Sequence, residues 1–280
     1  MEKEKKIPWI PLSVPFLLII GFLFVVSIGF PENAYATVTH SPCKISYRDD
    51  LSVEWVCRRL LKGETLESLF GDRWQDIARF NRIDRRHLYP GISLKIPIRL
   101  DDIRDYTPMP QHYQPAESEP KLILVDLSEQ FLGAYEHGQL VFSAPIATGT
   151  KDNATPRGTF RITAYSREHR SSLYQIEKST KFYPMNYGLR FYVDRDGVSY
   201  WFHGRDLPGY PASHGCIGLY DEAMQHEVYK SPTKPVLDDA RKLFEWAVSP
   251  LPDGKGLQNV ENGPKVLIIG HASGSNPSYR

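Results

Sequence analysis

The sequence of 280 residues predicts an α+β protein in two parts. A small β-α-α-β module is expected at residues 53–98, and a β-rich domain, an antiparallel sandwich or barrel, at residues 121–270. Three observations support this. Short apolar stretches separated by turn residues crowd the second part. Two helical patterns follow them near the C-terminal end. The module has a strand pattern at each end and helical patterns between.

The first segment, residues 1–36, has the features of an export signal. Three lysines precede an uncharged stretch from Trp9 to Phe30, and Ala34 to Ala36 gives the small-x-small pattern of a signal peptidase site. The alternative is an uncleaved anchor, because the uncharged stretch is long enough to span a bilayer. Either way we expect a protein exported to the periplasm or cell envelope, which touches the membrane only through this segment and only if it is uncleaved.

Charge and cysteine content limit the partners. Lys and Arg total 34 and Asp and Glu 33, a net charge of +1 that gives no support to a nucleic-acid partner. Cys43 and Cys57 are near enough in sequence to pair in an oxidising compartment, or they are two separate thiols. Cys216 lies far from both, and an odd cysteine in an exported protein suggests a reactive thiol.

The module is defined by local patterns. Residues 53–61 suit a strand, residues 66–70 a short helix, and Asp72 with Gln75 three residues later suggests a capping box for a second helix. A turn and a half-buried strand close the unit at residues 88–97.

The module resembles the LysM carbohydrate-binding module. The matching residues are Gly63-Glu64-Thr65-Leu66, Trp74 and Ile77 before Asn81, and Leu88-Tyr89-Pro90-Gly91. The resemblance implies binding to glycan that contains N-acetylglucosamine, with Gly63, Glu64, Thr65 and the loop near Asn81 lining the groove. The alternative is a packed module that has lost sugar binding.

Residues 99–120 contain four prolines among polar residues and suggest a semi-rigid linker. Strands or hairpins are then expected at 121–127, 131–149, 158–166, 191–204 and 265–270. Asp221 would cap one helix, and Pro235 suits the first turn of another with one apolar stripe.

The stretch Ser213-His214-Gly215-Cys216-Ile217 carries the chemistry. A cysteine nucleophile acts as thiolate and needs a nearby base, and His203 and His214 are the candidates. Gly215 allows a close backbone approach, and the amides of Gly215 and Cys216 would face a developing oxyanion.

Two other interpretations of Cys216 exist. An open zinc site would use His203, His214 and Cys216, but no second cysteine or acidic residue stands at ligand spacing, so we expect no metal and no cofactor. A buried, small apolar Cys216 conflicts with its polar and glycine neighbours, which favour an exposed loop.

Residues 121–270 resemble the catalytic domain of the L,D-transpeptidases, the YkuD-like family. The matching segments are Leu124–Ser128 with Gln130, Ala147–Gly149, Thr155–Phe160, His203-Gly204 and Ser213–Ile217. The resemblance implies a β-rich fold and a thiol acyl transfer on peptidoglycan stem peptides.

Matched position by position, the resemblance implies that Cys216 is the nucleophile and His203 the general base. His214 and Gly215 would shape the oxyanion pocket, and Ser213 would brace the loop. Gly204 would lie at the substrate site, with its carbonyl orienting the ring of the base. Thr155 and its neighbours would form a turn near the cleft.

Two positions depart from the family pattern. Only nine residues separate His203 from Ser213, fewer than in many members. Gly218 stands where the family usually has Arg or Asn, a polar side chain that helps to hold the active-site loop or the substrate.

The implied reaction has two halves. The thiolate attacks the carbonyl between the third residue of a tetrapeptide stem and its terminal D-alanine. D-alanine departs, and a thioester forms. An amine of a neighbouring stem, or of a lysine on an envelope protein, then takes the acyl group. Two alternatives stay open: a hydrolase with water as acceptor, and a wall-binding protein with an impaired catalytic domain.

Overall fold

The computed structural model describes residues 41–176, 179–250 and 256–272. They belong to one compact unit that spans residues 39–280. The expected export segment, residues 1–36, lies outside the described residues. In the part of the chain that is described, none of the helices combines the length and the apolarity that crossing a bilayer requires.

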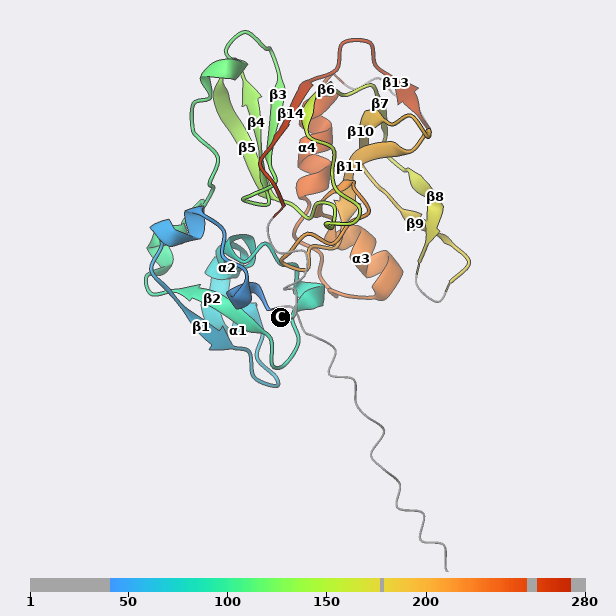
Figure 1. Cartoon of the computed structure of the whole chain (residues 1–280). Coiled ribbons are helices and arrows are strands. Elements are labelled where there is room, and N and C mark those ends of the chain that lie inside the picture. Colours follow the sequence, from blue (N-terminus) through green and yellow to red (C-terminus); the bar gives the residue numbers. More distant parts are fainter. Residues whose placement is uncertain (1–40, 177–178, 251–255, 273–280) are drawn as a thin grey trace, which may run out of the picture. The chain divides into compact units, whose positions relative to one another are not determined.

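The β-α-α-β order of the first part is present (Figure 1). Its elements are β1 (Trp55–Arg59), α1 (Leu66–Phe70), α2 (Trp74–Phe80) and β2 (Ser93–Pro97). The two strands pair antiparallel, with Trp55 opposite Pro97. The expected capping box at Asp72 is wrong: this residue lies within a 3-10 helix, Gly71–Arg73, and α2 begins only after it.

Short 3-10 helices and one disulfide complete this part. The 3-10 helices are Pro42–Lys44, Asp49–Ser52, Gly71–Arg73, Arg85–His87, Leu100–Ile103 and Gln114–Ala116. Cys43 and Cys57 form a disulfide, which ties the first of them to β1. Closing a loop of this length contributes about 3 kcal/mol in the chain-entropy model.

Residues 99–120, expected as a semi-rigid linker, are irregular apart from two short 3-10 helices, and several of their side chains are buried. Ile103, Tyr106, Met109 and Ala116 are buried in the same apolar cluster as the helices of the module. The segment is therefore packed along its length, because its few apolar side chains all find a place in that cluster.

The second part consists of two five-stranded sheets and a hairpin. One sheet has the order β5-β4-β3-β14-β6, with β3 (Leu122–Asp126), β4 (Phe131–Glu136), β5 (Gln139–Pro145), β6 (Gly158–Arg161) and β14 (Lys265–Ile269). The other has the order β12-β11-β10-β7-β13, with β7 (Ala164–Ser166), β10 (Gly188–Val193), β11 (Ser199–Arg205), β12 (Ile217–Tyr220) and β13 (Gln258–Asn259). The hairpin pairs β8 (Arg170–Gln175) with β9 (Phe182–Pro184).

The β-rich character is confirmed, but the sheets are mixed rather than antiparallel. β14 runs parallel to β3, and β12 runs parallel to β11. Both pairs join strands separated by other structure, as parallel neighbours require. The single strand expected at 158–166 is instead two strands, β6 and β7, which belong to different sheets.

Burial on both faces explains the continuous apolar sequence of β3. Leu122 and Leu124 pack with the cluster of the module, whereas Ile123 and Val125 pack with the second sheet. The helices are α3 (Glu222–Tyr229) and α4 (Asp239–Ala247). The apolar stripe of α4 packs into the cluster between the sheets, although the helix starts four residues after Pro235.

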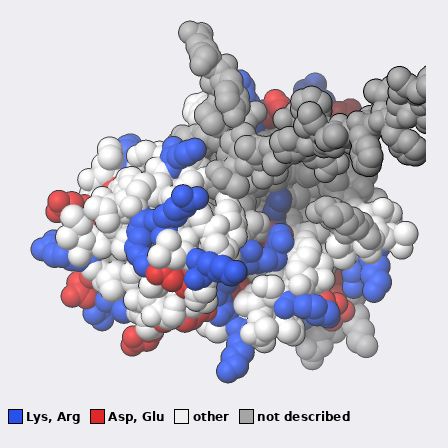
Figure 2. All heavy atoms as spheres, turned by 90° about the horizontal axis from the view of Figure 1, so that it is seen from below, with Lys and Arg blue, Asp and Glu red and all other residues white. Residues whose placement is uncertain are grey.

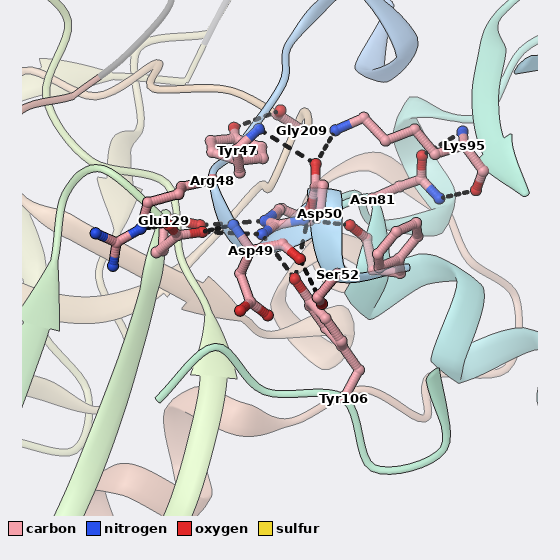
Figure 3. Close-up of polar contacts among 12 residues, drawn as sticks. Tyr47, Arg48, Asp49, Asp50, Ser52, Asn81, Lys95, Tyr106, Glu129 and Gly209 are labelled. Carbon is pink, nitrogen blue, oxygen red and sulfur yellow. Dashed lines mark hydrogen bonds and ion pairs between the residues drawn. The ribbon is translucent and has the colours of Figure 1, made fainter. Parts of the chain in front are cut away.

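A buried polar network, formed by Asp50, Arg82, Lys95 and Glu129, joins the two parts (Figure 3). Asp50 accepts hydrogen bonds from Arg82 Nη1 at 2.6 Å and from Lys95 Nζ. Arg82 Nε donates to the backbone carbonyl of Glu129 at 3.2 Å. Burial lowers the pKa of Lys95 and raises that of Glu129. Two anions and two cations thus balance in a space that water does not reach.

Candidate active site

The nucleophile and base candidates lie on neighbouring strands. β11 carries His203, and β12 begins immediately after Cys216. The parallel register places His203 opposite Gly218. Side chains two residues apart share a face of a strand, so the chain directs residue 216 to the face that carries His203. The register therefore places Cys216 and His203 on the same face of the sheet, on neighbouring strands.

His203 is held in a defined tautomer. Its side chain is buried, with 4% of the residue exposed, and Nδ1 lies 2.8 Å from the carbonyl oxygen of Gly204. A carbonyl only accepts, so Nδ1 carries the proton and Nε2 carries the lone pair. Burial lowers the pKa of His203 from 6.5 to about 3. At neutral pH the ring is uncharged and can accept a proton at Nε2.

Cys216 is a free, partly exposed thiol. Burial raises its pKa, while the backbone N–H of Trp201 and the charge of Arg205 act in the opposite direction. The balance is a raised pKa, so the resting group is the protonated thiol. The pair is neutral before substrate binds, and a proton must move from sulfur to imidazole during attack.

The loop before Cys216 is braced from within. Ser213 Oγ donates to the carbonyl of Cys216 at 2.5 Å and accepts from the amide of Gly215 at 3.0 Å. Thr155 Oγ1 donates to the carbonyl of Gly215 at 2.9 Å. Gly215 has φ +113°, and a Cβ there would lie 2.6 Å from the ring of Tyr200. Only glycine fits, and its amide is engaged by Ser213 rather than directed at a ligand.

His214 faces away from this bracing. Its ring is exposed and stacks on Tyr174 of the β8–β9 hairpin, with ring centres 4.2 Å apart and an angle of 18° between the planes. Burial, followed by the charge of Arg205, lowers its pKa. Gly204 is buried, and its amide donates to the carbonyl of Asn186 at 2.8 Å. Both backbone groups of Gly204 are thus used inside the protein.

The residues expected in the module lie in different surroundings. Gly63 and Thr65 are exposed, and Thr65 Oγ1 accepts from the amide of Ser68 at 3.1 Å as the cap of α1. Asn81 is 1% exposed. Its amide donates to the carbonyls of Ile77 and Lys95, both at 2.9 Å. The side chain of Asn81 therefore holds α2 to β2.

The chain between β11 and Ser213 is held by the module. Asp84 Oδ2 accepts from the amide of Leu207 at 2.6 Å, and the Asp84 amide donates to the Leu207 carbonyl at 2.8 Å. Ile83 forms a β-bridge with Pro208. Sequence reasoning missed this contact, because a charged loop such as residues 81–87 gives no sign that it packs beside another strand.

Two further residues near the site were also missed. Tyr174 sits on a hairpin without a clear period in its sequence. Arg205 looks like an ordinary surface charge, although it follows His203-Gly204 directly. The glycine at position 218, where the family usually has a polar side chain, was the one sign in the sequence that another side chain fills this space. Among the described residues, no group of three or more His, Cys, Asp or Glu side chains is arranged to hold a metal ion.

The family model of the YkuD L,D-transpeptidase catalytic domain matches residues 120–268, more than half of the chain. No curated protein matches the chain.

Solved structures with similarity to the chain are L,D-transpeptidases by name. One from Stackebrandtia nassauensis is 19% identical, with 73% of this chain and 69% of that one covered and a TM-score of 0.38. One from Xylanimonas cellulosilytica is 22% identical, with 77% and 98% covered and a TM-score of 0.39.

L,D-transpeptidase 1 from Mycobacterium tuberculosis is 19% identical, with 54% of this chain covered and a TM-score of 0.33; this chain spans 62% of that one. The assignment rests on the family model, its extent along the chain, and the two β-sheets that carry the matched segment. This chain belongs to the family of the YkuD L,D-transpeptidase catalytic domain.

Proposed function

We propose that the chain is a peptidoglycan L,D-transpeptidase with Cys216 as nucleophile and His203 as general base. The observation that carries the proposal is the pairing of β11 with β12, which brings a free thiol and a buried neutral imidazole to one face. The hydrogen bond from Nδ1 to Gly204 leaves Nε2 as the basic atom.

In the first half-reaction, Nε2 of His203 takes the thiol proton as Sγ of Cys216 attacks the carbonyl between the third residue and the D-alanine of a tetrapeptide stem. The C–N bond breaks, and the imidazolium returns the proton to the amine of the departing D-alanine. A thioester remains. In the second half, the acceptor amine attacks the thioester carbonyl as His203 takes its proton. The C–S bond breaks, and the imidazolium returns the proton to the sulfur of Cys216.

Charge on the tetrahedral oxygen needs N–H donors. The amide of Cys216 is the donor we propose, with His214 and Gly215 shaping the pocket around it. The Ser213 hydroxyl engages the Gly215 amide, so it braces the loop and takes that amide out of the resting site. Thr155 supports the same loop from the other side of Gly215.

We propose a stem amine, or a lysine on an envelope protein, as the acceptor. The test is incubation of the mature chain with purified tetrapeptide muropeptides, followed by mass analysis of the products. A cross-linked dimer with free D-alanine is expected. Tripeptide alone would show that water is the acceptor and the enzyme a hydrolase, and unchanged substrate would indicate a wall-binding protein with an impaired domain.

We further propose that residues 53–98 are a LysM-like module that binds glycan containing N-acetylglucosamine. Support comes from the β-α-α-β order and from the exposure of Gly63 and Thr65 at the start of α1. Figure 2 shows the face of the molecule seen from below, where Lys and Arg side chains and Asp and Glu side chains are both present.

A purely structural module is a second candidate, and one observation favours it. Asn81 is buried, and the residues after it are paired with Leu207 and Pro208 of the second part. Titration of the labelled full chain with a chitin oligosaccharide distinguishes the two. Shifts of the Gly63 and Thr65 amide signals support glycan binding, whereas unchanged signals at millimolar oligosaccharide support the structural role.

Such a substrate lies outside the cytoplasmic membrane, so the proposed function includes export. We expect cleavage after Ala36, which makes Thr37 the first residue of the mature protein. N-terminal sequencing of native protein tests this. A chain that begins at Met1 would instead favour an uncleaved anchor.

A further inference from the structure

Position 218 lacks a side chain, but the space beside it is filled. A Cβ built on Gly218 would lie 2.6 Å from Cδ and 2.7 Å from Cβ of Arg205. Real Cβ atoms do not come so close to other carbon atoms, because packed interiors leave no such overlap. The stem of Arg205 therefore occupies the volume that a side chain at position 218 would need.

The register of the strands explains this exchange. Gly218 lies opposite His203, and Arg205 is two residues further along β11. The side chain of Arg205 thus emerges on the same face as His203, beside the bare backbone of Gly218. That backbone is fixed by Ala147, whose N–H and C=O pair with Gly218 at 3.0 and 2.9 Å.

The guanidinium reaches the loop of the nucleophile. Arg205 Nη2 donates to the carbonyl of Ala212 at 2.8 Å, one residue before Ser213. The amides of Ala212 and Ser213 both donate to the carbonyl of Thr148 at 2.9 Å. The loop is therefore anchored on one side by the backbone carbonyl of Thr148 and on the other by the side chain of Arg205.

One polar atom of this arginine suggests a role other than stability. Arg205 Nε is buried and makes no hydrogen bond within the described residues. A buried donor without a partner is costly, and each such group in a native structure calls for an explanation.

We propose that Arg205 is the positioning residue of the nucleophile loop and takes the place of the side chain that Gly218 lacks. It holds the Ala212 carbonyl and places a fixed positive charge beside the thiol. The inference rests on the proposed role of Cys216. In agreement with it, the charge of Arg205 lowers the pKa of Cys216 and that of His203, which favours thiolate formation and keeps the base neutral.

The test exchanges the two positions. Arg205→Ala should slow acylation of Cys216 by a carbapenem about 10- to 100-fold, since a hydrogen bond to a charged group is lost. Gly218→Arg alone should also be slow, because its side chain overlaps that of Arg205. The double variant, Arg205→Gly with Gly218→Arg, also removes the Cβ of residue 205 that would lie 2.7 Å from the new Cβ at position 218, and it should recover to within about threefold of wild type. Arg161→Ala, which removes another strand arginine bonded to a backbone carbonyl, is the control and should not change the rate.

A second readout separates position from mere folding. Cys216 is the free thiol of the chain, so the rate of its alkylation by iodoacetamide against pH reports thiolate formation. Arg205→Ala should shift this profile to higher pH, and the double variant should shift it back. An unshifted profile, or a double variant no faster than Arg205→Ala, overturns the proposal. A wild-type chain that alkylates but is not acylated would instead contradict the proposed function, and the alkylation profile would still decide the role of Arg205.

Discussion

Asp50 is the anion on which the buried polar network depends (Figure 3). It is fully buried and accepts hydrogen bonds from Arg82 and Lys95, whose side chains are equally removed from water. Asp50→Asn keeps the shape but leaves two buried cations without their shared anion. Removing one partner of a buried ion pair costs about 3–5 kcal/mol, and we expect the free energy of unfolding to fall by that amount.

The assay is equilibrium unfolding of the mature chain in urea, followed by tryptophan fluorescence. Asp101→Asn is the control, because Asp101 pairs with Arg104 and Arg73 while its side chain is 79% exposed. This variant should lose less than about 1 kcal/mol. Adding Lys95→Met to Asp50→Asn should recover part of the loss, since the remaining buried cation, Arg82, still has Glu129 as its anion. A loss for Asp50→Asn no larger than for Asp101→Asn would refute the reasoning.

The remaining predictions concern the site and its support. His203→Ala should slow acylation about 10²–10⁴-fold and recover partly at alkaline pH, while His214→Ala should do less harm; the reverse pattern, measured by mass spectrometry with a carbapenem, would assign the base to His214. The pKa of His203 is about 3 in the fold against 6.5 unfolded, so the unfolded chain binds the proton first. The free energy of unfolding should therefore fall by about 1.4 kcal/mol for each pH unit from pH 6.5 down to pH 3. His203→Gln should remove this dependence on pH from urea unfolding curves, and an unchanged dependence would contradict the lowered pKa. Asp84→Ala should expose the Leu207 amide to hydrogen exchange and slow acylation, and unaltered protection would show that this contact is unimportant. Cys57→Ser should lower the free energy of unfolding by about 3 kcal/mol, and a loss below 1 kcal/mol would argue against the disulfide.

The hairpins and helices that the sequence predicted correctly are those with a clear local pattern. Alternation and turn residues located the hairpins β4–β5 and β10–β11, and helical periodicity located α1, α2 and the stripe of α4. These features depend on residues close in sequence, where propensity and period act directly. The residues around Cys216 left both His203 and His214 as candidate bases, and the choice of His203, which came from the family resemblance, stays a prediction.

Non-local features could not be predicted in this way. The parallel neighbours of β3 and β11 come from distant segments, and periodicity does not identify a strand's partner. Asp50, Arg82, Lys95 and Glu129 are charged and would be expected at the surface, yet these two anions and two cations lie together in the interior. The role proposed for Arg205 depends on Gly218 in the neighbouring strand. Local sequence patterns do not show that these two residues lie side by side.

Trapping of the acyl group on Cys216 is the decisive experiment for the proposed reaction. The mature chain is mixed with a tetrapeptide muropeptide, quenched in acid within the first turnover, and analysed by intact and peptide mass spectrometry. We expect an adduct with the mass of the donor less D-alanine, located on the peptide that contains Cys216 and absent from Cys216→Ala. An adduct on another residue, or cross-linked product made by Cys216→Ala, would contradict the account.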